Sequence, residues 1–236
     1  MAELTIAGAP TPSADAVVLD AAVLGVTELN ERLRALAAEG TDARIVNPAA
    51  RHHLVVGVLD RITIEIEGTA GYFAASLLDG PDVHITGSAG WSLGDNLMQG
   101  RIVVEKNAGA FVGPGMRGGT IVVRGSAGNR LGQVMKGGTI IVGGDAGFMT
   151  GNMLINGTVI ILGNVGQDCG EHIVAGTIYV GGSIASLGED AVEAEFTDGD
   201  RALVAERLAP YGFTVPEIMR KVVSAGRLHH YKIREF

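Results

Sequence analysis

The stretch GSAGNRLGQVMKGGTIIVG, residues 125–143, decides the fold. Five glycines precede a short apolar run, and a sixth closes it. The same pattern recurs every nineteen residues from Gly68 to Gly181, in six blocks without insertion or deletion. A fixed period near twenty residues indicates stacked units, each too small to bury its apolar face alone.

Glycine occupies fixed places within the blocks, which we number from position one to position nineteen. Position eight is glycine in all blocks but the first, where Ala75 stands. Position four is always glycine, and these structural coil glycines are Gly71, Gly90, Gly109, Gly128, Gly147 and Gly166. Glycine adopts positive φ angles without a Cβ penalty, so we expect these positions to form the corners of each unit.

Each block ends in a β-branched run such as Thr139–Val142, which favours a strand. Nineteen residues are too few for a strand plus a crossover helix, which needs about thirty. The repeat therefore predicts a mainly β fold, a single-stranded parallel β-helix of about seven coils stacked about 4.8 Å apart. Side chains alternate along a strand, so positions sixteen and eighteen should form the dry interior. They hold Val83, Ile102, Ile121, Ile140, Val159 and Ile178, and Ile85, Val104, Val123, Val142, Ile161 and Val180.

Position seventeen points outward by the same alternation, yet it is apolar in consecutive coils. We call this column the stripe: Val103, Val122, Ile141, Ile160 and Tyr179. Stacked at the coil spacing, it would extend roughly 20 Å. An exposed apolar strip of this size marks an interface. The sequence leaves two alternatives open, a partner protein or coverage by the chain's own terminal segments. His84, in the same column, is expected to be solvated.

The flanks lack the repeat. Residues 1–48 predict a small α/β N-terminal cap, with strands at 17–20 and 43–46 and a helix over 27–40 that Thr27 caps and Gly40 ends. Such a cap would cover the unpaired edge of the first coil. The β-helix itself is predicted over residues 49–188.

Residues 189–236 predict an acidic linker, two short C-terminal helices at 200–212 and 216–226, and a docking tail. The pattern is already lost from Gly182, and the stretch from there to Asp200 carries six acidic residues and no basic one, which is typical of a solvated linker.

Composition excludes several classes of protein. The net charge of −8 argues against a nucleic-acid binder, and a single cysteine excludes a disulfide framework. The sequence shows no signal peptide and no apolar run of membrane-spanning length, so we expect a cytoplasmic protein.

Two motifs invite a chemical interpretation. Gly113–Gly118 matches the G-x-G-x-x-G dinucleotide pattern, but it precedes a predicted strand instead of opening a helix, so we interpret it as structural. The cluster Asp168, Cys169, Glu171 and His172 in the last full coil is the candidate functional cluster, because a nucleophilic cysteine needs a nearby base. Cys169, however, falls at position seven, where other coils place Leu93 or Val112, and this favours a buried, inert thiol. We therefore expect no catalytic residue, cofactor site or metal site on this chain.

The coils with G-x-A-G, a glycine four residues on and G-G-T-I-x-V resemble the GXGXG domain. That domain is the right-handed β-helix at the C-terminus of the glutamate synthase large subunit, and it also occurs as one of the subunits of formylmethanofuran dehydrogenase. The resemblance covers about residues 50–190. Val165–His172, with Gly176 following, is similar to the glutamate synthase stretch V-G-D-H-G-C-E-Y…G-G, although the cysteine and glycine are transposed and His172 replaces the tyrosine.

The resemblance extends to the free-standing β-helix subunits of N-methylglutamate synthases, and it implies a function. It implies a non-catalytic scaffold subunit of a transferase complex in methylamine metabolism, which makes N-methylglutamate from methylamine and glutamate. The implied partners in this hetero-oligomer are a class II glutamine amidotransferase-like subunit and a glutamate-synthase-like subunit that carries FMN and an iron–sulfur cluster.

Three other interpretations stay open. The chain could be the GXGXG subunit of a formylmethanofuran dehydrogenase or of a formyltransferase/hydrolase complex. It could be a stand-alone, homo-oligomeric binding module that uses the stripe. The third interpretation is an enzyme that uses Cys169 and His172.

Overall fold

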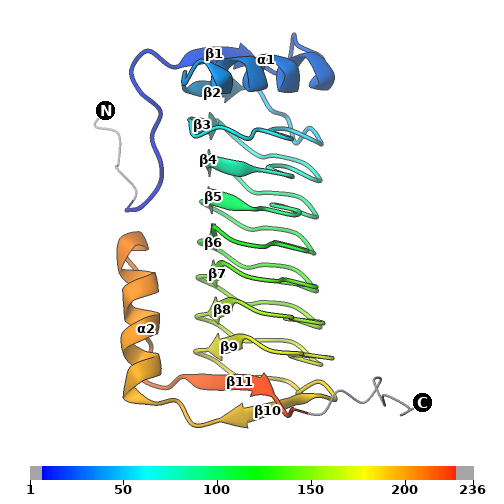
Figure 1. Cartoon of the computed structure of the whole chain (residues 1–236), viewed down its shortest axis with the longest axis vertical. Helices are drawn as coiled ribbons and strands as arrows, with labels where there is room; N and C mark the ends of the chain where they lie inside the picture. Colours follow the sequence, from blue (N-terminus) through cyan, green and yellow to red (C-terminus); the bar gives the residue numbers. More distant parts are fainter. Residues whose placement is uncertain (1–6, 227–236) are drawn as a thin grey trace, which may run out of the picture.

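A computed structural model describes residues 7–226, which form a β-solenoid with a small cap at each end (Figure 1). Eleven strands form one sheet in the order β1-β2-β3-β4-β5-β6-β7-β8-β9-β11-β10. Its coil strands are β3 (Thr63–Ile66), β4 (Asp79–Ile85), β5 (Gln99–Val104), β6 (Thr120–Val123), β7 (Thr139–Val142), β8 (Thr158–Ile161) and β9 (Thr177–Val180). They pair in parallel, and partners such as Ile121 and Ile140 are nineteen residues apart. The predicted mainly β solenoid with a nineteen-residue repeat is confirmed.

The interior is packed with four columns of side chains. The two predicted columns, positions sixteen and eighteen, are fully buried throughout. Positions seven and eleven add two more, with Leu93 and Leu97 as their members in one coil, both fully buried. Because each buried aliphatic side chain contributes about 1.5–3 kcal/mol, these columns are the main source of stability of the rod.

The coil glycines have two separate functions, and only one of them is the predicted one. At position eight, glycines such as Gly94 (φ +68°) adopt the left-handed conformation. At position four the reason is space: a Cβ on Gly90 would lie 2.6 Å from the carbonyl carbon of Gly71 in the preceding coil. Position-four glycines therefore allow the close approach of neighbouring coils.

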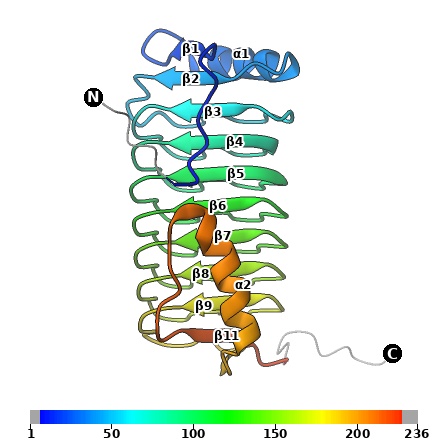
Figure 2. The same cartoon turned by 90° about the vertical axis from the view of Figure 1, so that its left-hand side faces the viewer.

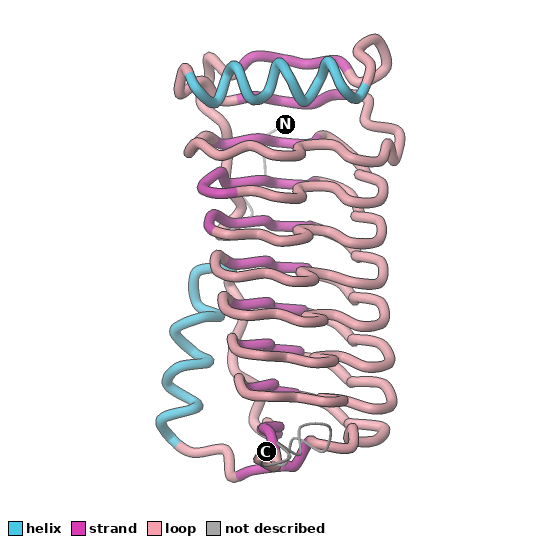
Figure 3. Tube along the Cα trace, turned by 45° about the vertical axis from the view of Figure 1, so that its right-hand side comes forward, coloured by secondary structure: helices cyan, strands magenta, loops and turns pink. Residues whose placement is uncertain are grey.

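Left-handed backbone is not confined to glycine. Phe73, Ala75 and Leu77, at positions six, eight and ten, all have φ between +54° and +57°. Their amides point alternately to the two neighbouring coils, since Phe73 N–H donates to Trp91 O (2.8 Å) and Ala75 N–H to Leu54 O (2.9 Å). Inter-coil hydrogen bonds thus continue through the part of each coil drawn as loop in Figure 3, and they offset the cost of the unusual φ angles.

The N-terminal cap has the predicted elements. β1 (Val17–Asp20) pairs in parallel with β2 (Ala43–Val46), and α1 (Val26–Ala38) connects them. The helix begins earlier than predicted, since Gly25 and not Thr27 is its N-cap. Its buried residues Leu29 and Leu33 close the first coil. No helix among the described residues has the length and apolarity that a membrane crossing requires.

The C-terminal segment has one of its two predicted helices. The first predicted helix forms, as α2 (Asp198–Leu208) followed by the single turn η1 (Ala209–Tyr211). The predicted second helix over 216–226 is wrong: β11 (Arg220–Ser224) forms there, between β9 and β10 (Ala191–Ala194), and pairs antiparallel with both. Its Val222 and Val223 are β-branched, and the free edge of β9 offers them hydrogen-bond partners.

The stretch from Gly182 to Asp200 is not a simple solvated linker. Ile184 forms a bridge with Val165, and Leu187 with Cys169, so the stretch begins a further coil. Asp190 and Asp200 are buried. The predicted docking tail, with His229 and His230, lies outside the described residues beyond residue 226.

The stripe is covered by the chain's own segments. All five members are buried, and they form a second apolar core with Val204 and Leu208 of α2, Tyr211 and Met219. Figure 2 shows α2 lying across β6–β9, while the segment before β1 descends along the strands above it. Of the two alternatives that the sequence left open, the structure supports coverage from within the chain.

Asp200 anchors this cover to the rod. Its carboxylate accepts hydrogen bonds from Tyr179 Oη (2.6 Å) and Lys221 Nζ (3.0 Å), and Thr197 completes a capping box at the start of α2. Burial acts to raise the pKa of Asp200, but the hydrogen bonds from Tyr179, Thr197 and Lys221 outweigh it and hold the pKa below the ordinary 3.8.

A lowered pKa in the folded state makes ionised Asp200 a source of stability above pH 4. We expect this contribution to be lost as the pH falls from 4 toward the depressed pKa. Asp200→Asn should lower the melting temperature at pH 7 and flatten its decline below pH 4. Thermal denaturation from pH 7 to pH 2 measures both effects, and identical acid profiles of the two proteins would contradict the assignment.

A line of charged side chains continues the stripe toward the N-terminal cap. His84 is buried between Glu65 (Nδ1 to Oε2, 3.2 Å) and Glu105 (Nε2 to Oε1, 3.0 Å), contrary to the predicted solvation. The other carboxylate oxygen of each glutamate pairs with an arginine: Glu65 Oε1 with Arg44 (3.0 Å) and Glu105 Oε2 with Arg124 (3.0 Å). Arg124 also donates to Tyr211 O and Ala7 O, so the line connects both terminal segments to the coils.

Replacing His84 with alanine would leave Glu65 and Glu105 facing each other in a buried space. We expect His84→Ala to lower the free energy of unfolding by about 3 kcal/mol, because the buried carboxylates of Glu65 and Glu105 both lose a hydrogen-bond partner. Glu67→Gln, which removes a half-exposed contact to Arg44, is the matched control and should cost at most about 1 kcal/mol. Urea denaturation measures the free energy of unfolding of both variants. Equal losses in the two would show that the buried position of His84 adds no stability beyond that of an exposed contact.

Candidate functional site

The predicted cluster lies where the last full coil meets the C-terminal cap. Asp168 (φ +56°) and His172 (φ +55°) occupy positions six and ten, which are left-handed throughout the rod. This backbone turns their side chains and that of Glu171 to the outside, whereas Cys169 at position seven points inward. The four residues therefore do not form one site.

Cys169 is a structural residue. It is fully buried, and its backbone is held by the next rung, since its N–H donates to Ser186 O (3.0 Å) and its carbonyl accepts from Gly188 N–H (2.8 Å). Burial, with a smaller contribution from the negative charge of Glu193, raises the pKa of the thiol to about 12. The thiol therefore stays protonated at neutral pH and is a poor nucleophile, which removes the support for catalysis by Cys169 and His172.

Asp168 fixes the next rung as well. Its Oδ1 accepts a hydrogen bond from the Ser186 hydroxyl (3.2 Å), and its backbone N–H donates a hydrogen bond to Ser186 Oγ (2.9 Å). The side chain is thus directed along the rod, toward the start of the further coil.

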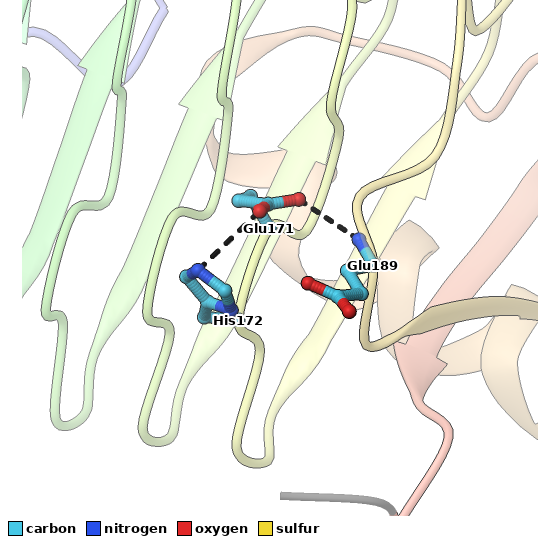
Figure 4. Close-up of side chains that lie close together, drawn as sticks. All are labelled: Glu171, His172 and Glu189. Carbon is cyan, nitrogen blue, oxygen red and sulfur yellow. Dashed lines mark hydrogen bonds and ion pairs between the residues drawn. The ribbon is translucent and has the colours of Figure 1, made fainter. Parts of the chain in front are cut away.

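Glu171 and His172 meet two acidic residues that the sequence did not assign to the site. His172 Nε2 lies 3.4 Å from Glu171 Oε1, and His172 Nδ1 lies 3.3 Å from Asp190 Oδ2. Glu171 Oε2 accepts from the backbone N–H of Glu189 (2.8 Å), and Figure 4 shows the Glu189 carboxylate beside the same space. Glu189 and Asp190 were predicted to be linker residues.

A signal for these two residues is present in the sequence. Val165 and Ile184 are paired at the usual spacing of nineteen, but Cys169 and Leu187 are paired at eighteen. The further coil is therefore one residue shorter than the others, between Ile184 and Leu187, and a search for a strict nineteen-residue repeat does not find it. With an offset of eighteen, Glu189 aligns with Glu171 and Asp190 with His172.

The group has the chemistry of a cation site. Within residues 7–226, Glu171, His172 and Glu189 are the set of three ligand-type side chains whose atoms lie within 4.8 Å of one another. Glu171 and His172 are partly buried and Glu189 is exposed, so the group lies at the surface and is accessible from solvent.

Gly113–Gly118, the second motif, is part of the coil. Gly113 and Gly115 are left-handed at positions eight and ten, and β6 follows. No helix begins here, which confirms the structural interpretation.

A different apolar surface remains exposed, and the sequence did not predict it. It follows positions five, six, ten and twelve, along the edge of the coils away from the covered stripe. We call it the ledge: Tyr72, Phe73, Leu77, Trp91, Met98, Met153, Ile155 and Val174, each at least 37% exposed. The rings of His52, Tyr72 and Trp91 stack on one another along the rod, with centroids 4.4 and 5.3 Å apart, so the ledge presents ring edges and not ring faces. Its members lie in the first two and the last two coils, and the two coils between them carry Arg117, Asn129, Arg130 and Lys136 at these positions, so the ledge consists of two apolar groups. Exposed apolar groups of this kind suit a protein partner better than a planar ligand.

A search of curated proteins found no match to this chain. A family model described as the GXGXG motif matches residues 38–202, which extend from the last residue of α1 through every coil to the start of α2. Since the match extends over most of the sequence and coincides with the stacked coils, the chain belongs to the GXGXG motif family.

Proposed function

We propose that this chain is the β-helix scaffold subunit of a glutamate-synthase-like complex, of the N-methylglutamate synthase type. It holds a class II glutamine amidotransferase-like subunit and a glutamate-synthase-like subunit at a fixed separation. FMN and the iron–sulfur cluster belong to the second of these partners. The whole complex makes N-methylglutamate from methylamine and glutamate, and this chain contributes no catalytic residue.

The observation that carries the proposal is a solid rod with exposed apolar groups on its outer edge, near both of its ends. The GXGXG family match supports a glutamate-synthase-like module. The four interior columns are fully packed, so the rod is suited to holding proteins on its outside. The stripe is occupied by α2 and the N-terminal segment, which leaves the ledge as the apolar surface for a partner.

Affinity capture of the full tagged chain from its native host tests the proposal. We expect an amidotransferase-like and a flavin-containing synthase-like protein to co-purify, with methylamine-dependent N-methylglutamate formation in the eluate. Trp91→Glu should reduce capture of a partner at least tenfold without changing the melting temperature, because a buried charge at the centre of an interface is strongly unfavourable. Val23→Glu, a substitution of an even more exposed apolar residue on the N-terminal cap, is the control.

Three outcomes would replace the proposal. A molybdenum–pterin or formyltransferase subunit in the eluate would assign the chain to a formylmethanofuran dehydrogenase or formyltransferase/hydrolase complex. A stable homodimer that captures no other protein, seen by analytical ultracentrifugation, would assign it to the stand-alone module. Turnover in the complex that is lost in Cys169→Ser would restore the enzyme interpretation.

A further inference from the structure

We propose that Glu171, His172 and Glu189 bind one divalent transition-metal ion of the Zn²⁺ type. The site lies at the seam between the last full coil and the C-terminal cap (Figure 4). The proposal is independent of the proposed function, because it concerns only side chains of this chain.

The spacing of the ligand atoms fits a metal ion. Zn²⁺ binds nitrogen and oxygen at about 2.0–2.2 Å in tetrahedral geometry, which places neighbouring ligand atoms about 3.4 Å apart. His172 Nε2 and Glu171 Oε1 are 3.4 Å apart, and each of the three residues offers one ligand atom that lies within 4.8 Å of those of the other two. Glu189 is exposed, so rotation of its side chain can shorten the remaining separations.

The imidazole is oriented as in metal sites. Asp190, which is only 2% exposed, holds His172 Nδ1 at 3.3 Å and thereby leaves Nε2 facing Glu171. In many zinc sites a carboxylate contacts the second nitrogen of a ligating histidine and fixes its tautomer and orientation. Asp190 lies at the beginning of the C-terminal cap and is not one of the three proposed ligands, so it orients His172 without binding the metal itself.

Charge favours a cation at this place. Glu171, Glu189 and Asp190 bring three carboxylates around one imidazole. The nearby acid Glu193 pairs with Arg220. A divalent ion between Glu171 and Glu189 would offset the repulsion between their two carboxylates.

The mixed ligand set selects the class of metal. Imidazole suits zinc, copper, iron and nickel, whereas Ca²⁺ and Mg²⁺ prefer sites made only of oxygen. Three protein ligands leave a fourth position for water. Because Glu171 and His172 lie on the coil and Glu189 on the following rung, a bound ion would connect the rod to its C-terminal cap and stabilise that seam.

Isothermal titration of the full, EDTA-treated chain with ZnCl₂ tests the site. We expect one Zn²⁺ per chain with Kd at or below about 10 µM, and Ca²⁺ and Mg²⁺ at least about tenfold weaker. At a hundredfold excess over Kd, the melting temperature should rise by about 5 °C. Absence of Zn²⁺ binding at 100 µM would overturn the proposal.

Variants assign the ligands. Glu189→Gln, at an exposed position that should not affect folding, should weaken Zn²⁺ at least tenfold, and Asp190→Asn about 10–100-fold. The control replaces His229 and His230 with alanine and should bind as the unmodified chain does. Unchanged affinity of Glu189→Gln, or lost affinity of the tail variant, would place the metal elsewhere and overturn the proposal. Co²⁺ bound at this site should show no thiolate charge-transfer band, and a strong band would mean that Cys169 is a ligand, which also contradicts it.

Discussion

Replacing Gly90 with alanine is expected to destabilise the chain by about 3 kcal/mol or more, although the change adds a single methyl group. The new Cβ would lie 2.6 Å from the carbonyl carbon of Gly71 and 2.8 Å from its oxygen. These are backbone atoms of the preceding coil, so a side-chain rotation cannot relieve the contact, and the two coils must separate. Separation would also weaken the inter-coil hydrogen bond from Gly90 N–H to Ala70 O (3.0 Å). With total stabilities commonly 5–15 kcal/mol, a loss of this size removes a large share of the margin.

Gly199→Ala is the matched control for Gly90→Ala. Gly199 lies in the first turn of α2, and a Cβ there would meet only Thr197 Oγ1 at an ordinary 3.6 Å. Alanine is also the better helix former, so this variant should be neutral or slightly stabilised. Urea denaturation followed by circular dichroism measures both variants, and a loss in Gly90→Ala no greater than in the control would contradict the close-packing role of position four.

The second large effect is expected from Val204→Asp in α2. Val204 is fully buried against the stripe, and a carboxylate placed there would be desolvated at a cost of several kcal/mol. The chain can avoid this cost by releasing α2 from the coils. Because the stripe and its cover form an apolar core separate from the interior of the rod, we expect local release with the coils intact.

Hydrogen–deuterium exchange is the measurement for Val204→Asp. Amides of residues 198–211 should lose most of their protection, while those of β6–β8 keep it, and the exposed stripe should cause self-association in size-exclusion chromatography. Ala205→Asp, one residue further along on the exposed face of α2, should leave protection unchanged. Equal exchange in all three proteins would show that α2 does not hold the stripe.

The coils could be predicted from the sequence because the same pattern of glycines and β-branched residues occurs in six consecutive blocks. A β-branched run with side chains alternating in and out has one face to bury, and the constant spacing of nineteen places Ile121 against Ile140 without further information. The cap elements followed from equally local signals, such as the leucines of α1 and Gly40 after it.

What the sequence did not decide depends on contacts between distant parts of the chain. The stripe looks the same to local analysis whether α2 or a partner covers it. Residues 220–224 have a short, ambiguous apolar pattern, and the free edge of β9 selects the strand over the helix. Glu189 and Asp190 join Glu171 and His172 only through the eighteen-residue coil, which a strict nineteen-residue repeat passes over.

The central claim is that consecutive blocks are rungs of one stiff rod, and a distance along the rod tests it most directly. Thr69 and Asn164 both occupy position two, are exposed, and lie five coils apart. Spin labels at Thr69→Cys and Asn164→Cys should give one narrow distance near 24 Å by double electron–electron resonance, since five coils rise about 4.8 Å each. Buried Cys169 should not take a label. A broad distribution, or a maximum far from this value, would contradict the stacked rod.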